Sequence, residues 1–242
     1  MKKVKIIIYD FDGTLTPYPV TKFGIFEKCG VVEMENDPGI FEKIKKFRIR
    51  GLEEYDAIYS GFLEFILEHG FELTDENMSL GAEKLEYNEG VFEYLDDISK
   101  FGVKNYLLSS GIKVLLDKTI VSKFFTDIYA TTFRYDENNQ IIGTDYLMSD
   151  KKKVDIIKKI MDENNLTDCR DVIYIGDGLT DLYAMEFVKK NGGNSVFVYL
   201  DEQNKNISVA KERDVVSFFA YADYSSTSEL RTYITKLCEI GE

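Results

Sequence analysis

Residues 6–19 read IIIYDFDGTLTPYP, an apolar run that stops at two aspartates, Asp10 and Asp12, one residue apart. The run from Val4 to Tyr9 is almost entirely apolar and does not alternate, which is typical of a strand buried on both faces of a parallel sheet. Side chains at i and i+2 of an extended segment point the same way. Two carboxylates so placed repel each other unless a positive charge or a proton lies between them. The stretch therefore predicts a buried parallel strand with a charged partner at its end.

Further strands and helices are predicted to alternate along the chain. The strand patterns lie at Val103–Ser109, Asp127–Thr131, Asp171–Asp177 and Asn194–Leu200. The helical patterns lie at Val91–Lys100, Ile112–Phe124, Lys153–Asn164 and Thr180–Lys190. Such alternation predicts right-handed crossovers and an α/β fold with a doubly wound parallel sheet. The polar run at residues 136–140, DENNQ, predicts a hairpin turn.

Residues 17–88 interrupt the alternation of strands and helices. They form a mostly helical stretch that is too long for a simple connection between two strands. We interpret it as an inserted helical cap domain, and assign residues 1–16 and 89–242 to the core. Apolar residues fall on one helical stripe that stops at Gly70; they are Leu52, Tyr55, Tyr59, Phe62, Leu63, Ile66 and Leu67. Because such residues are usually buried, we interpret the stripe as packing and not as a ligand pocket.

Composition limits the possible partners and location. The 242 residues include 30 basic and 43 acidic ones, and the net charge of −13 would repel DNA or RNA over most of the surface. The three cysteines, Cys29, Cys169 and Cys238, are widely spaced and odd in number, which favours reduced thiols. The basic start is followed by an apolar stretch too short for a signal peptide, and no run is long enough to span a membrane. We expect a cytoplasmic protein without membrane or nucleic-acid partners.

Polar residues follow three of the predicted strands. Asp10 and Asp12 follow the first, residues 109–111 follow the second, and Asp177 with Asp181 follow the third. In an open parallel sheet these strand ends meet where ligands bind. Carboxylates gathered there favour a hard cation, and Mg²⁺ suits a site of a few carboxylates and phosphate oxygens. A serine followed by glycine at a strand-to-helix turn binds phosphate well, and the lysine run at 151–153 supplies a cation.

Four motifs in this order resemble the haloacid dehalogenase superfamily of Mg²⁺-dependent aspartyl phosphatases. They are DFDGT at residues 10–14, LLSSG at 107–111, a lysine before the last motif, and GDGLTD at 176–181. The lysine that opens the helix KVDIIKKI, Lys153, matches the family best, and Lys151 and Lys152 remain alternatives. A cap inserted between the first and second motifs is the arrangement of the phosphoserine phosphatase-like members.

The resemblance implies roles for individual residues. Asp10 would be the nucleophile that forms an aspartyl-phosphate, and Asp12 the general acid and base. Mg²⁺ would be held by Asp10, by the backbone carbonyl of Asp12 and by Asp177, with Asp181 as a ligand or a support. Ser109, Ser110 and Lys153 would bind the phosphate oxygens. The expected activity is hydrolysis of a small phosphorylated metabolite, a phosphomonoester.

Alternatives to these assignments remain open. The two serines also suit the N-cap of a helix, and an aspartate at position 181 also suits the first helical turn. One alternative is a phosphomutase of the same superfamily. Another is a non-catalytic module that binds Mg²⁺ and a phospholigand through an aspartate cluster at strand ends, although Asp12 argues against it. The stretch after the nucleophile begins with Pro17, Tyr18 and Pro19 and lacks an early acidic residue. That composition argues against phosphoserine and, with the aromatic cap, favours a hydrophobic leaving group.

Overall fold

A computed structural model describes residues 4–31, 37–202 and 205–239. The basic residues at positions 2 and 3, and residues 32–36 of the inserted segment, lie outside these ranges. Six parallel strands form one sheet in the order β3-β2-β1-β6-β7-β8. The strands are β1 (Ile6–Tyr9), β2 (Lys104–Ile112), β3 (Asp127–Thr131), β6 (Val172–Gly176), β7 (Asn194–Tyr199) and β8 (Phe218–Tyr221). All four residues of β1 are buried, between β2 and β6, as the sequence predicted.

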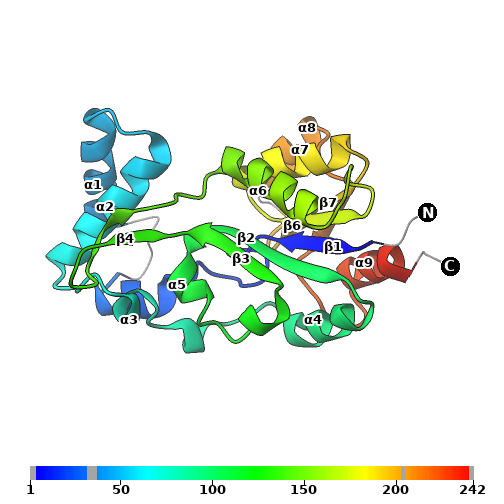
Figure 1. Cartoon of the computed structure of the whole chain (residues 1–242), viewed down its shortest axis with the longest axis horizontal. Coiled ribbons are helices and arrows are strands. Elements are labelled where there is room, and N and C mark those ends of the chain that lie inside the picture. Colours follow the sequence, from blue (N-terminus) through cyan, green and yellow to red (C-terminus); the bar gives the residue numbers. More distant parts are fainter. Residues whose placement is uncertain (1–3, 32–36, 203–204, 240–242) are drawn as a thin grey trace.

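Helices cover both faces of this sheet (Figure 1). One face packs against α4 (Val91–Lys100), α5 (Lys113–Leu116) and α9 (Glu229–Glu239). The other face packs against α6 (Asp150–Glu163), α7 (Leu182–Lys190) and α8 (Lys205–Glu212). Strand β1 serves both layers, because Ile7 and Tyr9 lie in the first apolar cluster while Ile6 and Ile8 lie in the second. The doubly wound α/β prediction is confirmed.

The predicted helix at Ile112–Phe124 is wrong. Strand β2 continues to Ile112, which is buried and pairs with Thr131 of β3. Helix α5 has only four residues, and a separate 3₁₀ turn, η4, covers Ser122–Phe124. Burial of Ile112 against the neighbouring strand therefore outweighs the local helical pattern. The last predicted helix also begins differently, with a 3₁₀ turn, η5 (Leu179–Asp181), ahead of α7.

The inserted segment contains α1 (Pro38–Ile49), α2 (Glu54–Glu68) and the short α3 (Asp75–Met78). An irregular turn, η1 (Lys22–Phe26), precedes them and a 3₁₀ turn, η3 (Ala82–Lys84), follows. Helix α1 starts sharply because Asp37 accepts hydrogen bonds from the amides of Gly39 and Ile40, and proline occupies the first helical position. In Figure 1, α1 and α2 lie beyond the end of the sheet, away from α9.

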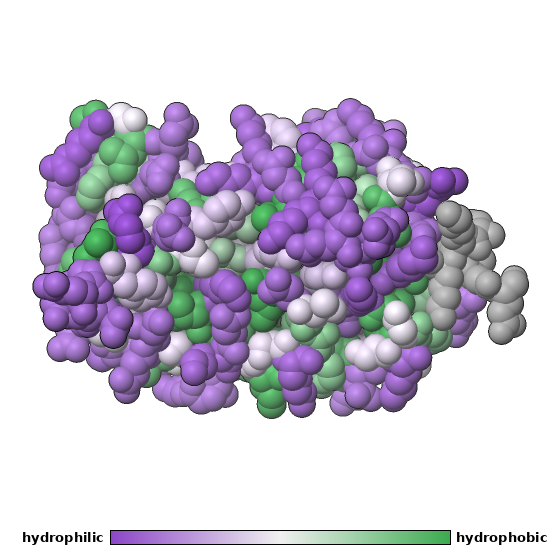
Figure 2. All heavy atoms as spheres, in the orientation of Figure 1, coloured by the Kyte–Doolittle hydropathy of each residue, from purple (hydrophilic) through white to green (hydrophobic). Residues whose placement is uncertain are grey.

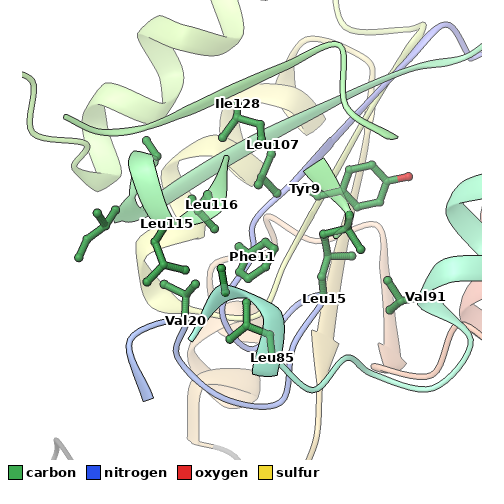
Figure 3. Packing of buried hydrophobic residues seen from close by; sticks show 14 of the residues in the cluster. Tyr9, Phe11, Leu15, Val20, Leu85, Val91, Leu107, Leu115, Leu116 and Ile128 are labelled. Atoms are coloured by element: carbon green, nitrogen blue, oxygen red, sulfur yellow. The ribbon is translucent and has the colours of Figure 1, made fainter. Parts of the chain in front are cut away.

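The inserted segment shares one apolar cluster with the sheet. Figure 3 shows Val20 and Leu85, from the two ends of the insertion, close to Phe11 just after β1. A hairpin formed by β4 (Phe133–Tyr135) and β5 (Ile141–Thr144) confirms the predicted turn. It also contacts the insertion, since the amide of Ile141 donates to the carbonyl of Leu73 at 2.8 Å. Packing therefore continues from the sheet into the insertion.

Surface properties agree with the composition. Hydrophilic side chains cover most of the face in Figure 2. None of the helices in the described ranges is long and apolar enough to cross a lipid bilayer. Cys29, Cys169 and Cys238 are present as thiols.

Candidate active site

The carboxyl ends of β1, β2 and β6 are neighbours, because β1 pairs with the other two strands. Asp10 follows β1, Asp177 follows β6, and the Ser109–Gly111 stretch lies in the last part of β2. The chain runs from β1 to β2 and β3 on one side and returns to β6 on the other. This reversal of strand order makes a crevice at the strand ends, where ligands bind in such folds.

Lys153 lies at the centre of the acidic cluster. Its side chain is fully buried, and Nζ lies 3.1 Å from Oδ1 of Asp10 and 2.7 Å from Oδ1 of Asp181. Burial alone would lower the pKa of Lys153, but the carboxylates of Asp10 and Asp181 raise it well above its usual value. The ammonium therefore stays charged and fixes Asp10 at the end of β1. The sequence placed Lys153 here; Lys152 instead donates to the carbonyl of Leu147.

Asp181 uses both carboxylate oxygens within the protein. Oδ1 accepts from Lys153 Nζ and, at 2.6 Å, from the hydroxyl of Tyr174. Oδ2 accepts from the amides of Asp177 and Gly178 at 3.2 and 3.0 Å. The side chain is completely buried. Four donors therefore hold this carboxylate, which in turn fixes the lysine and the loop after β6.

Asp177 lies against the turn that follows β1. The hydroxyl of Thr14 donates to its Oδ1 at 3.2 Å. Gly13 has φ of +77°, and a Cβ at that position would overlap Oδ2 of Asp177, so only glycine lets the two loops come this close. Burial, followed by the carboxylates of Asp181 and Asp10, raises the pKa of Asp177. The position of this carboxylate is thus set by two segments far apart in the sequence.

These carboxylates have the chemistry of a cation site. Oxygens of Asp10, Asp177 and Asp181 lie within 4.8 Å of one another. Burial, together with the carboxylate of Asp181, raises the pKa of Asp10 to about 7. A single buried lysine leaves the cluster with excess negative charge. Hard oxygen donors in this arrangement fit Mg²⁺, which is held by few carboxylates and keeps positions for water or phosphate.

Asp12 has a different environment from Asp10. Its Oδ1 accepts from the amide of Val20 at 2.7 Å. Burial raises the pKa of Asp12 to about 7, although the Val20 amide acts in the opposite direction. The carboxyl group is therefore near the balance between its protonated and ionised forms at neutral pH, as a group that donates and accepts protons needs to be.

The serines of β2 border the same space. Ser109 is buried, and its Oγ accepts from the amide of Gly111 at 3.0 Å. The hydroxyl of Ser110 is buried and has no hydrogen-bond partner among the described residues. The carbonyl of Ser110 accepts from the hydroxyl of Tyr59 in α2 at 2.5 Å. An unpartnered hydroxyl at this position suits an incoming phosphate oxygen.

A cavity of about 320 Å³ lies between these strand ends and the inserted segment. Asp10, Asp12, Ser109, Ser110 and Asp177 line it on the side of the sheet. The side of the insertion is lined by Pro19, Val20, Thr21, Phe26, Tyr55, Ile58, Tyr59 and Phe62. Lys153 and Asp181 lie behind Asp10 and do not line it.

The interpretation of the aromatic stripe as packing alone does not describe Tyr55, Tyr59 and Phe62, which line this cavity. Leu63 and Ile66 are buried as expected, whereas Leu52 and Leu67 are exposed, and Leu52 lies before the start of α2. Tyr174 was missed, although a hydroxyl within the aliphatic run VIYIG is a signal of a buried polar partner.

Comparison with known proteins places the chain in a family. The model of the haloacid dehalogenase-like hydrolases matches residues 7–186. No curated protein matches the chain significantly.

Among solved structures, the fold is similar to a haloacid dehalogenase-family hydrolase from Salmonella enterica serovar Typhi, with TM-score 0.70, 14% identity, and coverage of 99% of this chain and 73% of the other. The structure of a phospho-aspartyl intermediate analogue of phosphoserine phosphatase matches with TM-score 0.63 and 20% sequence identity. The match covers 97% of this chain and 99% of the other. The fold is also similar to that of a cytosolic 5'-nucleotidase IIIB bound to cytidine, with TM-score 0.61 and 15% sequence identity. The match covers 96% of this chain and 85% of the other. The family match spans most of the chain and all four motifs, and the chain therefore belongs to the haloacid dehalogenase-like hydrolases.

Proposed function

We propose that this hydrolase is a Mg²⁺-dependent phosphatase that cleaves a small phosphomonoester through an aspartyl-phosphate on Asp10. The observation that carries the proposal is the pairing of two carboxyl groups in the cavity. Asp10 is fixed by the buried ammonium of Lys153, whereas Asp12 accepts a hydrogen bond from the amide of Val20 at 2.7 Å. A nucleophile held in place beside a proton donor and acceptor is the minimum that this reaction requires.

The chemistry assigns a separate task to each group. An oxygen of Asp10 attacks phosphorus, the bond from phosphorus to the leaving oxygen breaks, and protonated Asp12 gives its proton to that oxygen. Ionised Asp12 then accepts a proton from water as the water attacks phosphorus, which releases inorganic phosphate and restores Asp10. The hydroxyl of Ser110, which lacks a partner among the described residues, supports an assignment of Ser110 and its neighbour Ser109 to the phosphate oxygens. Lys153 does not line the cavity, and it holds the Asp10 carboxylate in place from behind.

We assign the cation to Asp10, Asp177 and the backbone carbonyl of Asp12. Because four protein donors already occupy Asp181, its carboxylate is better suited to holding Lys153 and the loop after β6 than to ligating the metal directly. When bound, Mg²⁺ would neutralise charge on the phosphoryl oxygens and on the carboxylates.

We also propose that residues 17–88 act as a cap on a core made of residues 1–16 and 89–242. The hydrogen bond from Tyr59 to the carbonyl of Ser110 and the shared apolar cluster support a cap that closes on the phosphate site. A small phosphorylated metabolite fits a cavity of this size. The three thiols support a cytoplasmic location.

The test is phosphate release from a broad panel of phosphomonoesters with and without Mg²⁺, for wild type, Asp10→Asn and Asp12→Asn. We expect turnover only with Mg²⁺, loss of turnover in Asp10→Asn, and a loss of about 10²–10⁴-fold in Asp12→Asn. Asp155→Asn, whose side chain is 73% exposed, is the matched control. Transfer of phosphate to a second hydroxyl would indicate a phosphomutase, and binding without any turnover would indicate a phospholigand-binding module.

A further inference from the structure

The wall of the cavity that faces the phosphate site is mainly apolar and aromatic, and its polar groups are uncharged hydroxyls of Thr21, Tyr55 and Tyr59. Tyr55, Ile58, Tyr59 and Phe62 have the spacing i, i+3, i+4 and i+7, which places them on one face of α2. All four line the cavity, together with Phe26 and Val20 from the entry to the insertion. One helical face therefore forms most of the surface that the leaving group of a bound phosphomonoester would meet.

This wall offers no ionic partner. The described residues that the insertion contributes to the lining include no Lys, Arg, His, Asp or Glu. Glu64 pairs with Lys46, and Glu54 pairs with Arg48, so these charged side chains of α1 and α2 do not serve the cavity. The hydroxyl of Tyr59 is already committed to the carbonyl of Ser110. A charged leaving group in this part of the cavity would lose its hydration without compensation.

The aromatic side chains also support one another in a fixed arrangement. Phe62 meets Phe26 edge to face, with ring centroids 5.8 Å apart, and meets Tyr59 at 6.4 Å. Phe133 of the β4–β5 hairpin also contacts Tyr59, with ring centroids 6.5 Å apart. Phe26, Tyr59 and Phe62 are all buried. A wall built from ring edges and faces is organised in advance to pack against another flat ring.

We propose that the leaving group of the substrate is an uncharged aromatic group, so that the substrate is an aryl or arylmethyl phosphomonoester. This inference rests on the proposed phosphate site at Asp10, and it adds the class of group that fills the rest of the cavity. Ile58 and Phe62 determine the selectivity, because both line the cavity and neither takes part in the cluster around Lys153.

The decisive measurement is equilibrium binding, which does not depend on turnover. Benzylphosphonate and 2-aminoethylphosphonate carry the same phosphonate but differ in the group attached, one aromatic and one cationic. With Mg²⁺ present, calorimetry should give an affinity for benzylphosphonate more than about tenfold higher. Equal or reversed affinities would overturn the inference. Tight benzylphosphonate binding without phosphate release from any ester would uphold the inference and reject only the proposed hydrolysis.

Two variants of α2 test whether the cavity wall formed by this helix causes the preference for an aromatic group. Ile58→Glu places a carboxylate in the cavity, and should reduce affinity for benzylphosphonate about tenfold or more while raising that for 2-aminoethylphosphonate. Leu67→Glu, on the same helix at a site 52% exposed, should leave both affinities unchanged. In catalysis, kcat/KM should be higher for benzyl phosphate than for O-phosphoserine. Both esters release a primary alcohol, so the comparison isolates the group attached to it. A variant Ile58→Glu that is folded by circular dichroism but keeps the wild-type preference would contradict the inference.

Discussion

At the scale of single residues, Lys153 neutralises part of the negative charge of the buried aspartate cluster. Its ammonium is the only cation placed against Asp10 and Asp181 among the described residues, and both contacts are buried. Removing one partner of a buried ion pair leaves the other charges without compensation. The lysines beside it in the sequence are exposed, so the same residue type has a different role one or two positions away.

Lys153→Met keeps most of the volume but removes the charge. We expect the free energy of unfolding to fall by about 3–5 kcal/mol, and phosphate release to be lost, because Asp10 and Asp181 then repel each other. Urea unfolding and a phosphate assay measure the two effects. Lys151→Met, on the exposed side of the same helix, should resemble wild type in both. Wild-type stability in Lys153→Met would show that the ion pairs are not needed.

At the scale of elements, the two linkers of the inserted segment cross in close contact. Gly81 has φ of +89°, and a Cβ there would overlap the carbonyl oxygen of Phe23 in the entry turn η1. Gly70, after α2, has φ of +74° but open space around it. Substitution of either glycine would strain the backbone, but only substitution of Gly81 would also cause a steric clash. Comparing the two positions therefore separates these two effects.

Gly81→Ala should destabilise the protein by about 1–3 kcal/mol more than Gly70→Ala. The reason is that both substitutions force alanine into a left-handed backbone conformation, and only the first also pushes the two linkers apart. Thermal and urea unfolding of the two variants measure the difference. Equal losses in the two variants would mean that the crossing of the linkers does not constrain the insertion.

At the scale of the whole molecule, the acidic cluster links stability to pH and metal. The pKa values of Asp10 and Asp12 are raised to about 7, above the value of about 4 that unfolded aspartates have. The folded protein without metal therefore binds protons more tightly than the unfolded chain. Its free energy of unfolding should fall as pH rises from about 4 to about 7. Mg²⁺ favours the ionised carboxylates and opposes this loss.

Melting temperatures in EDTA and in Mg²⁺ test this linkage. The increase in melting temperature caused by Mg²⁺ should be small at about pH 5 and larger at about pH 8, because protons compete with the metal for the same carboxylates. Asp10→Asn should reduce both the gain and its dependence on pH, whereas the exposed Asp155→Asn should not. An identical gain at the two pH values would contradict the assignment of these carboxylates to the cation.

The sequence alone determined five of the six parallel strands, the hairpin and the family motifs, because these are carried by local patterns; it did not predict β8 (Phe218–Tyr221). It also placed Asp10, Asp12, Asp177 and Lys153 near one edge of the sheet, since parallel strands share their carboxyl ends. Only the tertiary structure decided that β2 continues to Ile112, because that depends on pairing with β3.

The tertiary structure also decided what surrounds each carboxylate. Lys153 reaches Asp10 across 143 positions and Thr14 reaches Asp177 across 163. No local pattern specifies such pairs, because they arise when separate strands settle into one register. The same holds for α2: its stripe showed which residues share a face, but only the packing of the inserted segment turned Tyr55, Ile58 and Phe62 toward the cavity.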